Sequence, residues 1–320
     1  MKKNRNNFIL SLLSTVLFAA CEVVDPMDSE QYQKDIYMIG ADTKVSSFEI
    51  PYGDEQEAFV SLSASGSQKV DRDVVITLKR NDEIVDWYNA KYMLDAPVKY
   101  QQLPLALINL PSWTATLKAG ELYTRFPFSL NTNELHCDSL YSIGFAIEST
   151  SDYQISENGS ELIFTLKLTN PYSGNYHLDA ARTTLKEETL PDGTTEWVEQ
   201  GMPIPVSIQR TLTAASQNTV RFFHDKTKET LAEYSNSWNP GKDYFTAVKN
   251  LCVNFVQVSE NKFTVRAWED MPIVNGEAEY NNGTFTFWYD YMDGEGRYRM
   301  QGTLSLIHIS EPTRPLYLSY

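Results

Sequence analysis

Cysteine and histidine are scarce in this chain. Its 320 residues include three cysteines, Cys21, Cys137 and Cys252, and four histidines, and none of these is arranged at the spacing of a metal site. The scarcity excludes a fold held together by many disulfides. We also predict that the protein has no structural zinc and no bound cofactor. Because Cys137 and Cys252 lie far apart, in what we interpret as different domains, we expect two buried thiols rather than a disulfide.

Positive charge is also in short supply. Lys and Arg number 27 against 42 Asp and Glu, which gives a formal net charge of −15. A net negative charge of this size repels phosphate backbones and anionic lipid head groups, so nucleic-acid binding is disfavoured. Neutral and cationic ligands are compatible with this charge.

Motifs of the common enzyme classes are missing. The sequence has no nucleophile elbow, glycine-rich phosphate loop or His-Glu-x-x-His motif. A glycosidase needs two carboxylates, and the only suggestive members are Asp243, Glu269, Asp270 and Asp290. An acidic surface explains these four more simply. We therefore predict a non-catalytic protein, with a glycoside hydrolase as the less favoured alternative.

No apolar run is long enough to span a bilayer, but a shorter one lies near the N-terminus. Residues 8–18 follow a basic start, as in a signal peptide, and lead through small residues into Cys21. That layout is typical of a bacterial lipobox. We predict a signal peptide over residues 1–20, lipidation of Cys21, and a flexible acidic tether over residues 21–34. The alternative is a simple secretory signal with an incidental cysteine.

The opposite end has an unusual sequence. Residues 304–314 (LSLIHISEPTR) resemble the in-frame translation of a sequencing adapter. We therefore predict that the natural sequence ends near Thr303, that residues 304–320 derive from the adapter, and that the last domain is cut short.

Between these ends, the pattern is that of β-strands. Short β-branched or aromatic runs, broken by Gly, Pro, Asn or Asp, recur over residues 35–169 and predict a β-sandwich. One short helix is predicted over residues 82–89 (DEIVDWYN), with Asp82 as its N-cap. Its apolar face, which we expect to pack on the sandwich, contains Ile84, Trp87 and Tyr88.

A domain boundary is predicted over residues 170–176 (NPYSGNY), because Pro171 stops a strand ladder and Gly174 permits a bend. A second β-rich run occupies residues 170–303 and predicts an antiparallel β-sandwich or a lipocalin-like barrel. Its most aromatic strand, over residues 284–291, places Phe285, Phe287, Tyr289 and Tyr291 on one face and Thr286, Trp288 and Asp290 on the other.

Glycan binding needs an exposed aromatic ring flanked by amide or carboxylate groups. The loop-like residues 234–244 (YSNSWNPGKDY) have that composition, with Trp238 as the platform. The alternative is that Trp238 folds back as a lid on the core. Two further tryptophans are second choices, with plain packing as their alternative. The candidate residues are Trp238, Asn236, Asn239, Asp243, Tyr244, Trp197 and Trp268.

Several motifs occur in the order found in one known family: VDWYN at 85–89, LP at 103–104, LKAGE at 117–121, NPYSGNY at 170–176 and NGTFTF at 282–287, followed by Tyr289 and Tyr291. With them, over about residues 35–303, the chain resembles a family of two-domain Bacteroidetes surface lipoproteins. The resemblance implies an N-terminal immunoglobulin-like domain and a C-terminal β-domain, both of unknown function.

The resemblance also implies a location and a role. Such proteins are typically encoded among polysaccharide-utilisation genes, which implies glycan capture by a protein lipid-anchored at the outer membrane and facing the exterior. We expect polysaccharide or oligosaccharide as the ligand, membrane contact through the lipid anchor only, and outer-membrane glycan-uptake proteins as further partners. The alternative function is a structural or protein-interaction component, such as an adhesin, of an outer-membrane assembly.

Overall fold

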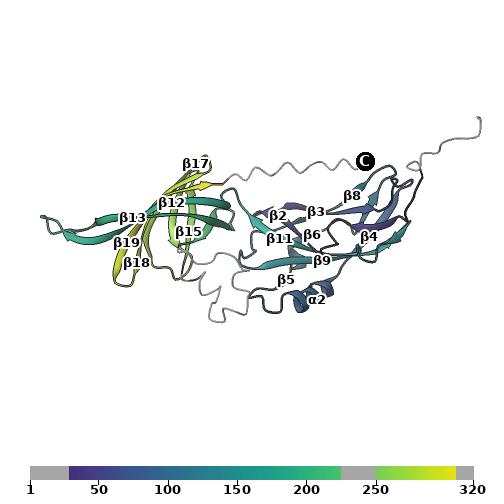
Figure 1. Ribbon diagram of the computed structural model, residues 1–320, viewed down its shortest axis with the longest axis horizontal. Helices are drawn as coiled ribbons and strands as arrows, with labels where there is room; N and C mark the ends of the chain where they lie inside the picture. Colours follow the sequence, from purple (N-terminus) through teal and green to yellow (C-terminus); the bar gives the residue numbers. More distant parts are fainter. Residues whose placement is uncertain (1–28, 225–248, 250, 308–320) are drawn as a thin grey trace, which may run out of the picture.

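The computed structural model describes residues 29–224, 249 and 251–307, which form two β-domains placed end to end (Figure 1). Strands account for most of both domains, so the predicted all-β class is confirmed. Among these residues, no helix has the length and apolar character needed to cross a membrane. The predicted signal peptide and Cys21 lie outside the described residues.

The first domain is a sandwich of two sheets. One sheet has the order β10-β1-β3-β8-β6 and the other β2-β11-β9-β4-β7, with β5 paired to β9. The neighbours β1-β3-β8 and β11-β9-β4 follow the A-B-E and G-F-C orders of an immunoglobulin domain, which confirms the predicted immunoglobulin-like sandwich. The elements are β1 (Asp35–Met38), β2 (Val45–Pro51), β3 (Gln56–Ala64), β4 (Val74–Arg80), α2 (Asp82–Tyr92), β5 (Tyr100–Gln102), the 3-10 helix η2 (Leu105–Leu107), β6 (Ile108–Asn109), β7 (Thr114–Leu117), β8 (Tyr123–Leu130), β9 (Leu140–Thr150), β10 (Gln154–Ile155) and β11 (Glu161–Thr169).

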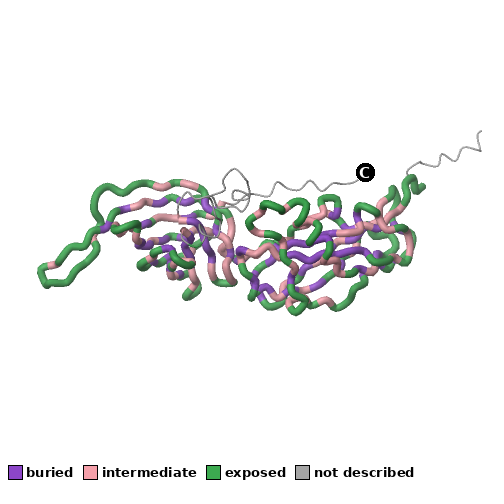
Figure 2. Tube along the Cα trace, turned by 90° about the horizontal axis from the view of Figure 1, so that it is seen from below, coloured by how far each residue is buried: buried purple, intermediate pink, exposed green. Residues whose placement is uncertain are grey.

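Alternation along the strands builds the core of the sandwich. In β8, Phe126 and Phe128 are buried while Arg125 and Pro127 are exposed, because successive side chains face opposite sides of a sheet. The same pattern in the facing sheet brings Phe145 against both phenylalanines. The buried strand centres run through the middle of the domain (Figure 2). Each such side chain contributes about 1.5–3 kcal/mol when it is fully buried.

The structure corrects two details of the predicted helix. The N-cap of α2 is Asn81 rather than Asp82, and Asn81 makes no side-chain cap hydrogen bond, since its amide instead donates to Glu161 at 2.8 Å. Val85 is buried, whereas Trp87 is 44% exposed. Trp87 lies on the surface beside Lys91, whose Nζ is 4.8 Å from the centre of the indole ring.

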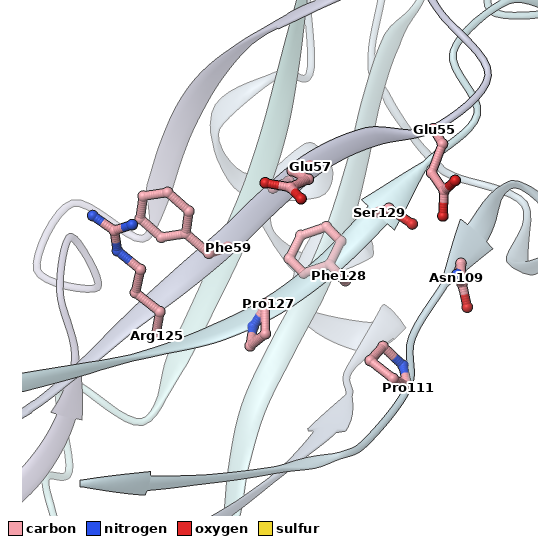
Figure 3. Close-up of a pocket in the computed structure, with 10 residues that line it drawn as sticks. Glu55, Glu57, Phe59, Asn109, Pro111, Arg125, Pro127, Phe128 and Ser129 are labelled. Atoms are coloured by element: carbon pink, nitrogen blue, oxygen red, sulfur yellow. The ribbon is translucent and has the colours of Figure 1, made fainter. Parts of the chain in front are cut away.

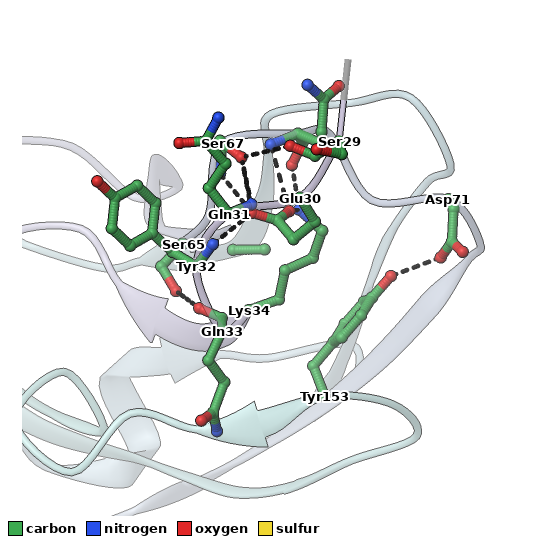
Figure 4. A network of polar contacts seen from close by, with 12 residues as sticks. Ser29, Glu30, Gln31, Tyr32, Gln33, Lys34, Ser65, Ser67, Asp71 and Tyr153 are labelled. Atoms are coloured by element: carbon green, nitrogen blue, oxygen red, sulfur yellow. Dashed lines mark hydrogen bonds and ion pairs between the residues drawn. The ribbon is translucent and has the colours of Figure 1, made fainter. Parts of the chain in front are cut away.

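Residues 29–34, which the sequence assigns to the flexible tether, are bonded to the turn between β3 and β4 (Figure 4). The carboxylate of Glu30 accepts hydrogen bonds from the backbone N–H and hydroxyl of Ser67 at 2.7 and 2.9 Å, and it pairs with Lys34. Bonding to Lys34 and Ser67 holds the pKa of Glu30 well below its usual range. This end of the predicted tether is therefore fixed to the first domain.

The second domain is a closed barrel of eight strands in sequence order, β12 to β19, so of the two predicted architectures the barrel is the one formed. Its last strand extends into the residues that the sequence assigns to an adapter, and Leu304 is buried in the core opposite Leu178. The ring of described strands is thus continuous, although the sequence predicts a domain cut short; the adapter origin of residues 304–320 stays a prediction. The strands are β12 (Gly174–Thr189), β13 (Thr195–Ser216), β14 (Thr219–Phe223), β15 (Cys252–Ser259), β16 (Lys262–Ala267), β17 (Ile273–Asn281), β18 (Thr284–Asp293) and β19 (Gly296–Leu306).

The first two barrel strands continue past the barrel as a hairpin arm over residues 186–203, which projects at the end far from the sandwich (Figures 1 and 2). β12 pairs with β19 only as far as Leu185, and the pairing of β12 with β13 shifts its register after Arg182. Most of the arm is exposed, including Met202 at 89%.

Buried polar contacts join the two domains. The Arg221 guanidinium of β14 donates to both carboxylate oxygens of Asp138 in the sandwich, at 2.7 and 2.5 Å, and both side chains are almost fully buried. The Asn170 amide donates to the carbonyl oxygens of Ser216 and Thr219 at 2.7 and 2.9 Å. These bonds fix the barrel directly to the end of the sandwich.

Candidate functional site

The structure places only some of the predicted binding residues. Trp238, Asn236, Asn239, Asp243 and Tyr244 lie outside the described residues, which leave out 225–248. Trp197 and Trp268 are described, and they occupy different parts of the second domain.

Trp268 lies at the contact between the domains. The guanidinium carbon of Arg221 is 4.7 Å from the centre of its ring, and the His136 ring of the sandwich is 5.9 Å away. The indole therefore covers the Arg221–Asp138 ion pair, which is the packing alternative that the sequence left open for it.

Trp197 lies on the hairpin arm and is 39% exposed. Its ring is covered by the guanidinium of Arg297 from β19, whose carbon lies 4.7 Å from the ring centre. The contact ties the base of the arm to the barrel wall and fixes the orientation of the indole.

A tryptophan that the sequence did not select, Trp288, lies on the outer face of the barrel in the middle of β18. Its neighbours Phe287 and Tyr289 are buried in the barrel core, so Trp288 faces outwards. Strand pairing places Gln301 on one side of it and Glu277 on the other, both exposed. An amide and a carboxylate thus flank a partly exposed indole.

A second polar row lies two residues further along the same strands. It crosses five strands and ends in a lysine, so hydroxyl, carboxylate and ammonium groups lie beside the indole. In register order the row is Asp179, Thr303, Thr286, Glu279 and Lys262. We call the two rows together the Trp288 face: Gln301, Trp288 and Glu277 with this second row.

Two hollows adjoin Trp288, and its side chain lines both. One, of about 650 Å³, extends over β12, β18 and β19 past Gln301 and Asp179. The other, of about 410 Å³, extends over β15 to β18 past Glu277 and Lys262. The indole is therefore a ridge between two open depressions that have polar walls.

Glycines allow the strands to approach closely on both sides of this ridge. A Cβ at Gly302 would lie 2.3 Å from the carbonyl oxygen of Asp179, and one at Gly276 would lie 2.7 Å from that of Trp288. A side chain at either position would force the strands apart, so both glycines help to keep the surface around Trp288 in shape.

A network of charges holds the indole in place. Asp290, only 1% exposed, accepts hydrogen bonds from Arg297 at 2.8 Å and from Arg299 at 2.8 and 3.2 Å. These hydrogen bonds raise the pKa of Arg299, which stays charged with its guanidinium carbon 4.8 Å from the centre of the Trp288 ring. Five side chains thus form a continuous stack that orients both tryptophans. Their order in space is Trp197, Arg297, Asp290, Arg299 and Trp288.

The described carboxylates that were considered for a glycosidase are each paired with basic side chains. Asp290 is neutralised by two arginines, whereas Glu269 and Asp270 are exposed and pair with Lys249 at 3.6 and 3.2 Å. Asp243 lies outside the described residues.

One group of potential metal ligands lies at the domain contact. His136, Cys137 and Asp138 bring their ligand atoms within 4.8 Å of one another. However, both oxygens of Asp138 accept hydrogen bonds from Arg221, and burial raises the pKa of Cys137 to about 11, so its sulfur is a neutral thiol. The group is therefore arranged for the domain contact rather than to supply anionic ligands.

The raised pKa of Cys137 has a measurable consequence. At pH 8 only about one Cys137 thiol in a thousand is ionised, and the thiolate is the reactive form. We expect slow alkylation of Cys137 by iodoacetamide in the native protein and fast alkylation in urea, measured by mass spectrometry on a Cys252→Ala variant. Of the two thiols predicted to be buried, Cys252 is buried and Cys137 is only partly buried, so fast native labelling at pH 8 would contradict the raised pKa of Cys137.

The signal for Trp288 was present in the sequence. The alternation over residues 284–291 already puts Trp288 on the face opposite Phe287 and Tyr289, and the face with four aromatic side chains is the one expected to be buried. Nothing local indicates Arg299 as its partner, since that contact depends on the pairing of β18 with β19.

Comparison with known families divides the chain in the same way as its fold. A family model described as an N-terminal domain matches residues 31–154, and a model described as C-terminal matches residues 160–305. No curated protein matches the chain.

Solved structures with similar folds come from Bacteroides. A protein of unknown function from Bacteroides ovatus has a TM-score of 0.57 at 14% identity, over 85% of this chain and 94% of the other. A multidomain protein from the same organism gives 0.55 at 14% identity, over 86% and 94%. An auxiliary nutrient binding protein from Bacteroides thetaiotaomicron gives 0.52 at 14% identity, over 82% and 91%.

Proposed function

We propose that this chain, which belongs to the two-domain family described by the paired N-terminal and C-terminal models, is a surface lipoprotein that binds polysaccharide without cleaving it. The observation that carries the proposal is the Trp288 face, where an oriented indole separates two hollows with polar walls. The similarity in fold to an auxiliary nutrient binding protein is in keeping with such a role.

The chemistry of the Trp288 face suits sugars. The apolar C–H side of a sugar ring packs on an aromatic ring, and its hydroxyls need hydrogen-bond partners of both kinds. Gln301 supplies an amide, and Glu277 and Asp179 supply carboxylates, on either side of the indole. Because carboxylates outnumber the one lysine of the face, neutral or amine-bearing sugars are favoured over uronic acids.

The attachment of residues 29–34 supports a lipid anchor at Cys21 that leads from the sandwich. Bonds to Glu30 fix this segment to the first domain, at the end away from the barrel (Figures 1 and 4). The seven residues between Cys21 and Ser29 span at most about 28 Å between their flanking positions when fully extended. We place the protein at the outer membrane, with the sandwich near the lipid and the barrel directed to the exterior.

A second candidate function is protein interaction within an outer-membrane assembly, and the hairpin arm favours it. The arm and the strand beyond it expose Met202 at 89% and Ile204 at 59%. Apolar side chains on a projecting ribbon are typical of a contact surface rather than of a sugar site.

Affinity electrophoresis tests the proposal. The chain from residue 22 onwards should be retarded in native gels that contain one neutral polysaccharide from a panel. Trp288→Ala should weaken binding about tenfold or more, because it removes a central aromatic anchor. Trp87→Ala, which removes a more exposed tryptophan in the other domain, is the control and should bind normally.

The outcomes separate the alternatives. Retardation lost in Trp238→Ala but kept in Trp288→Ala would move the site to the loop that the sequence favoured. No retardation of folded protein by any polysaccharide would contradict glycan binding and leave the interaction function of the hairpin arm.

A further inference from the structure

The outer face of the first domain carries a hollow of about 420 Å³ over strands β3, β8 and β6 (Figure 3). The alternation that sends Ala58 and Val60 into the sandwich core sends Glu57 and Phe59 outwards into this hollow. The hollow therefore has walls of side chains that the core does not use, over the buried Ala58 and Phe128, in the domain that lacks the Trp288 face.

One row of its lining is polar. Strand pairing aligns Glu57 of β3, Ser129 of β8 and Asn109 of β6 side by side on the outer face. Glu55 reaches the same region from the turn before β3, and Figure 3 shows it beside Asn109. Two carboxylates, a hydroxyl and an amide thus surround one end of the hollow.

The next row is apolar. Phe59 pairs with Pro127, and Pro111 continues the row where β6 has ended. β6 pairs with β8 only at Leu130 and Ser129, so β8 is an edge strand at Pro127, a position where a proline is tolerated. Rows on one face of a strand are about 7 Å apart, on the order of the width of a sugar ring.

The charge of the hollow is negative. Within the described residues neither Glu55 nor Glu57 forms an ion pair or a side-chain hydrogen bond. Arg125, the cationic residue of the lining, holds its guanidinium carbon 4.3 Å from the centre of the Phe59 ring, away from Glu55. A ligand that enters the polar end therefore meets two carboxylates whose charges are not compensated there.

We propose that this hollow is a second carbohydrate site, selective for amino sugars that carry a protonated amine. The amine would lie between Glu55 and Glu57, the hydroxyls would bond Asn109 and Ser129, and the C–H face of the ring would lie along the proline row. The inference rests on the proposed carbohydrate-binding function for its ligand class, but its site lies in the other domain, so the two can fail separately.

A matched pair of probes tests the charge requirement. Isothermal titration of the chain from residue 22 onwards at pH 6 and low salt would compare a glucosamine oligomer with the N-acetylglucosamine oligomer of the same length, which has no charge. We expect the glucosamine oligomer to bind about tenfold more tightly. That preference should shrink as salt is added, because an exposed charge contact is screened.

Variants locate the site. The double variant Glu55→Gln/Glu57→Gln keeps the shape and hydrogen-bonding size of both side chains and should abolish the preference for the amine. Glu148→Gln removes an exposed carboxylate of β9, in the other sheet of the same domain, and should leave it unchanged. Equal binding of the two oligomers, a preference retained in the double variant, or a preference lost in Glu148→Gln would each overturn the inference. If the preference for the glucosamine oligomer persists while no neutral polysaccharide binds, only the proposal for the Trp288 face is contradicted.

Discussion

Replacing Asp138 by alanine is expected to destabilise the protein by about 3–5 kcal/mol, the usual effect of leaving one partner of a buried ion pair without the other. Arg221 is 3% exposed, and both its terminal nitrogens donate to Asp138. Burial by itself would lower the pKa of Arg221, but the hydrogen bonds and charge of Asp138 more than offset burial and raise it. In the variant Asp138 no longer raises this pKa, but a guanidinium does not lose its proton in proteins, so the arginine stays charged with no carboxylate to compensate it. Urea unfolding followed by tryptophan fluorescence measures the change.

A paired replacement separates the ion pair from the packing around it. Asp138→Val combined with Arg221→Met removes both charges and comes close to the original combined volume, so we expect it to cost far less than Asp138→Ala alone. Lys167→Ala is the exposed control, because its 2.6 Å pair with Glu49 lies on the surface and should contribute at most about 1 kcal/mol. An Asp138→Ala protein as stable as the wild type would show that water reaches Arg221.

The same ion pair decides whether the two domains unfold together. Arg221 belongs to the barrel and Asp138 to the sandwich, and Trp268 packs over the guanidinium from the barrel side. If the ion pair couples the domains, we expect calorimetry to show one unfolding transition for the wild type and two for Asp138→Ala. Two-state behaviour is then lost, and each domain has its own stability.

Much of the fold follows from local patterns. The alternation over residues 123–130 predicts the strand that the structure has as β8, and the turn residues at 170–174 separate β11 from β12. Such features depend only on which residues alternate and where glycine and proline interrupt them.

Strands with mixed composition are harder to predict. β19 has two glycines and Thr303 as its one β-branched residue, and β12 has few β-branched residues, so neither has a strong strand signal in its composition. They form strands because closure of the barrel pairs them with each other and with their neighbours.

The features of the sites also differ in whether a local pattern or a long-range contact determines them. That Trp288 faces away from the barrel core is a period-two argument available from the sequence. That Asp138 and Arg221 meet is not, since they are separated by 83 residues and by the domain boundary. The hollow on the first domain depends on the register of β3, β8 and β6, which no local pattern specifies.

Replacing Asp290 by alanine is expected to affect stability and carbohydrate binding together. Asp290 is the only carboxylate that the described residues place between Arg297 and Arg299, and it is 1% exposed. Its loss leaves two neighbouring cations that repel one another, offset in part by Glu199, 3.6 Å from Arg299, and by the solvation that two arginines less buried than Asp290 gain. We expect a loss of about 3 kcal/mol in the free energy of unfolding. Arg299 would also move off the Trp288 ring, so retardation by polysaccharide should fall even in fully folded protein.

A conservative series distinguishes orientation of the indole from general damage. Arg299→Lys keeps a charge near Asp290 but loses the planar guanidinium that packs on Trp288, so it should weaken binding while costing little stability. Arg297→Lys alters the equivalent contact with Trp197, away from the hollows, and should bind nearly as well as the wild type. Equal binding by the Arg299→Lys and Arg297→Lys proteins would mean that the stack holds the hairpin arm but does not set the Trp288 face. Weaker binding by Arg299→Lys alone would tie the affinity to the orientation of one indole, because the two variants differ in which tryptophan the lost guanidinium covered.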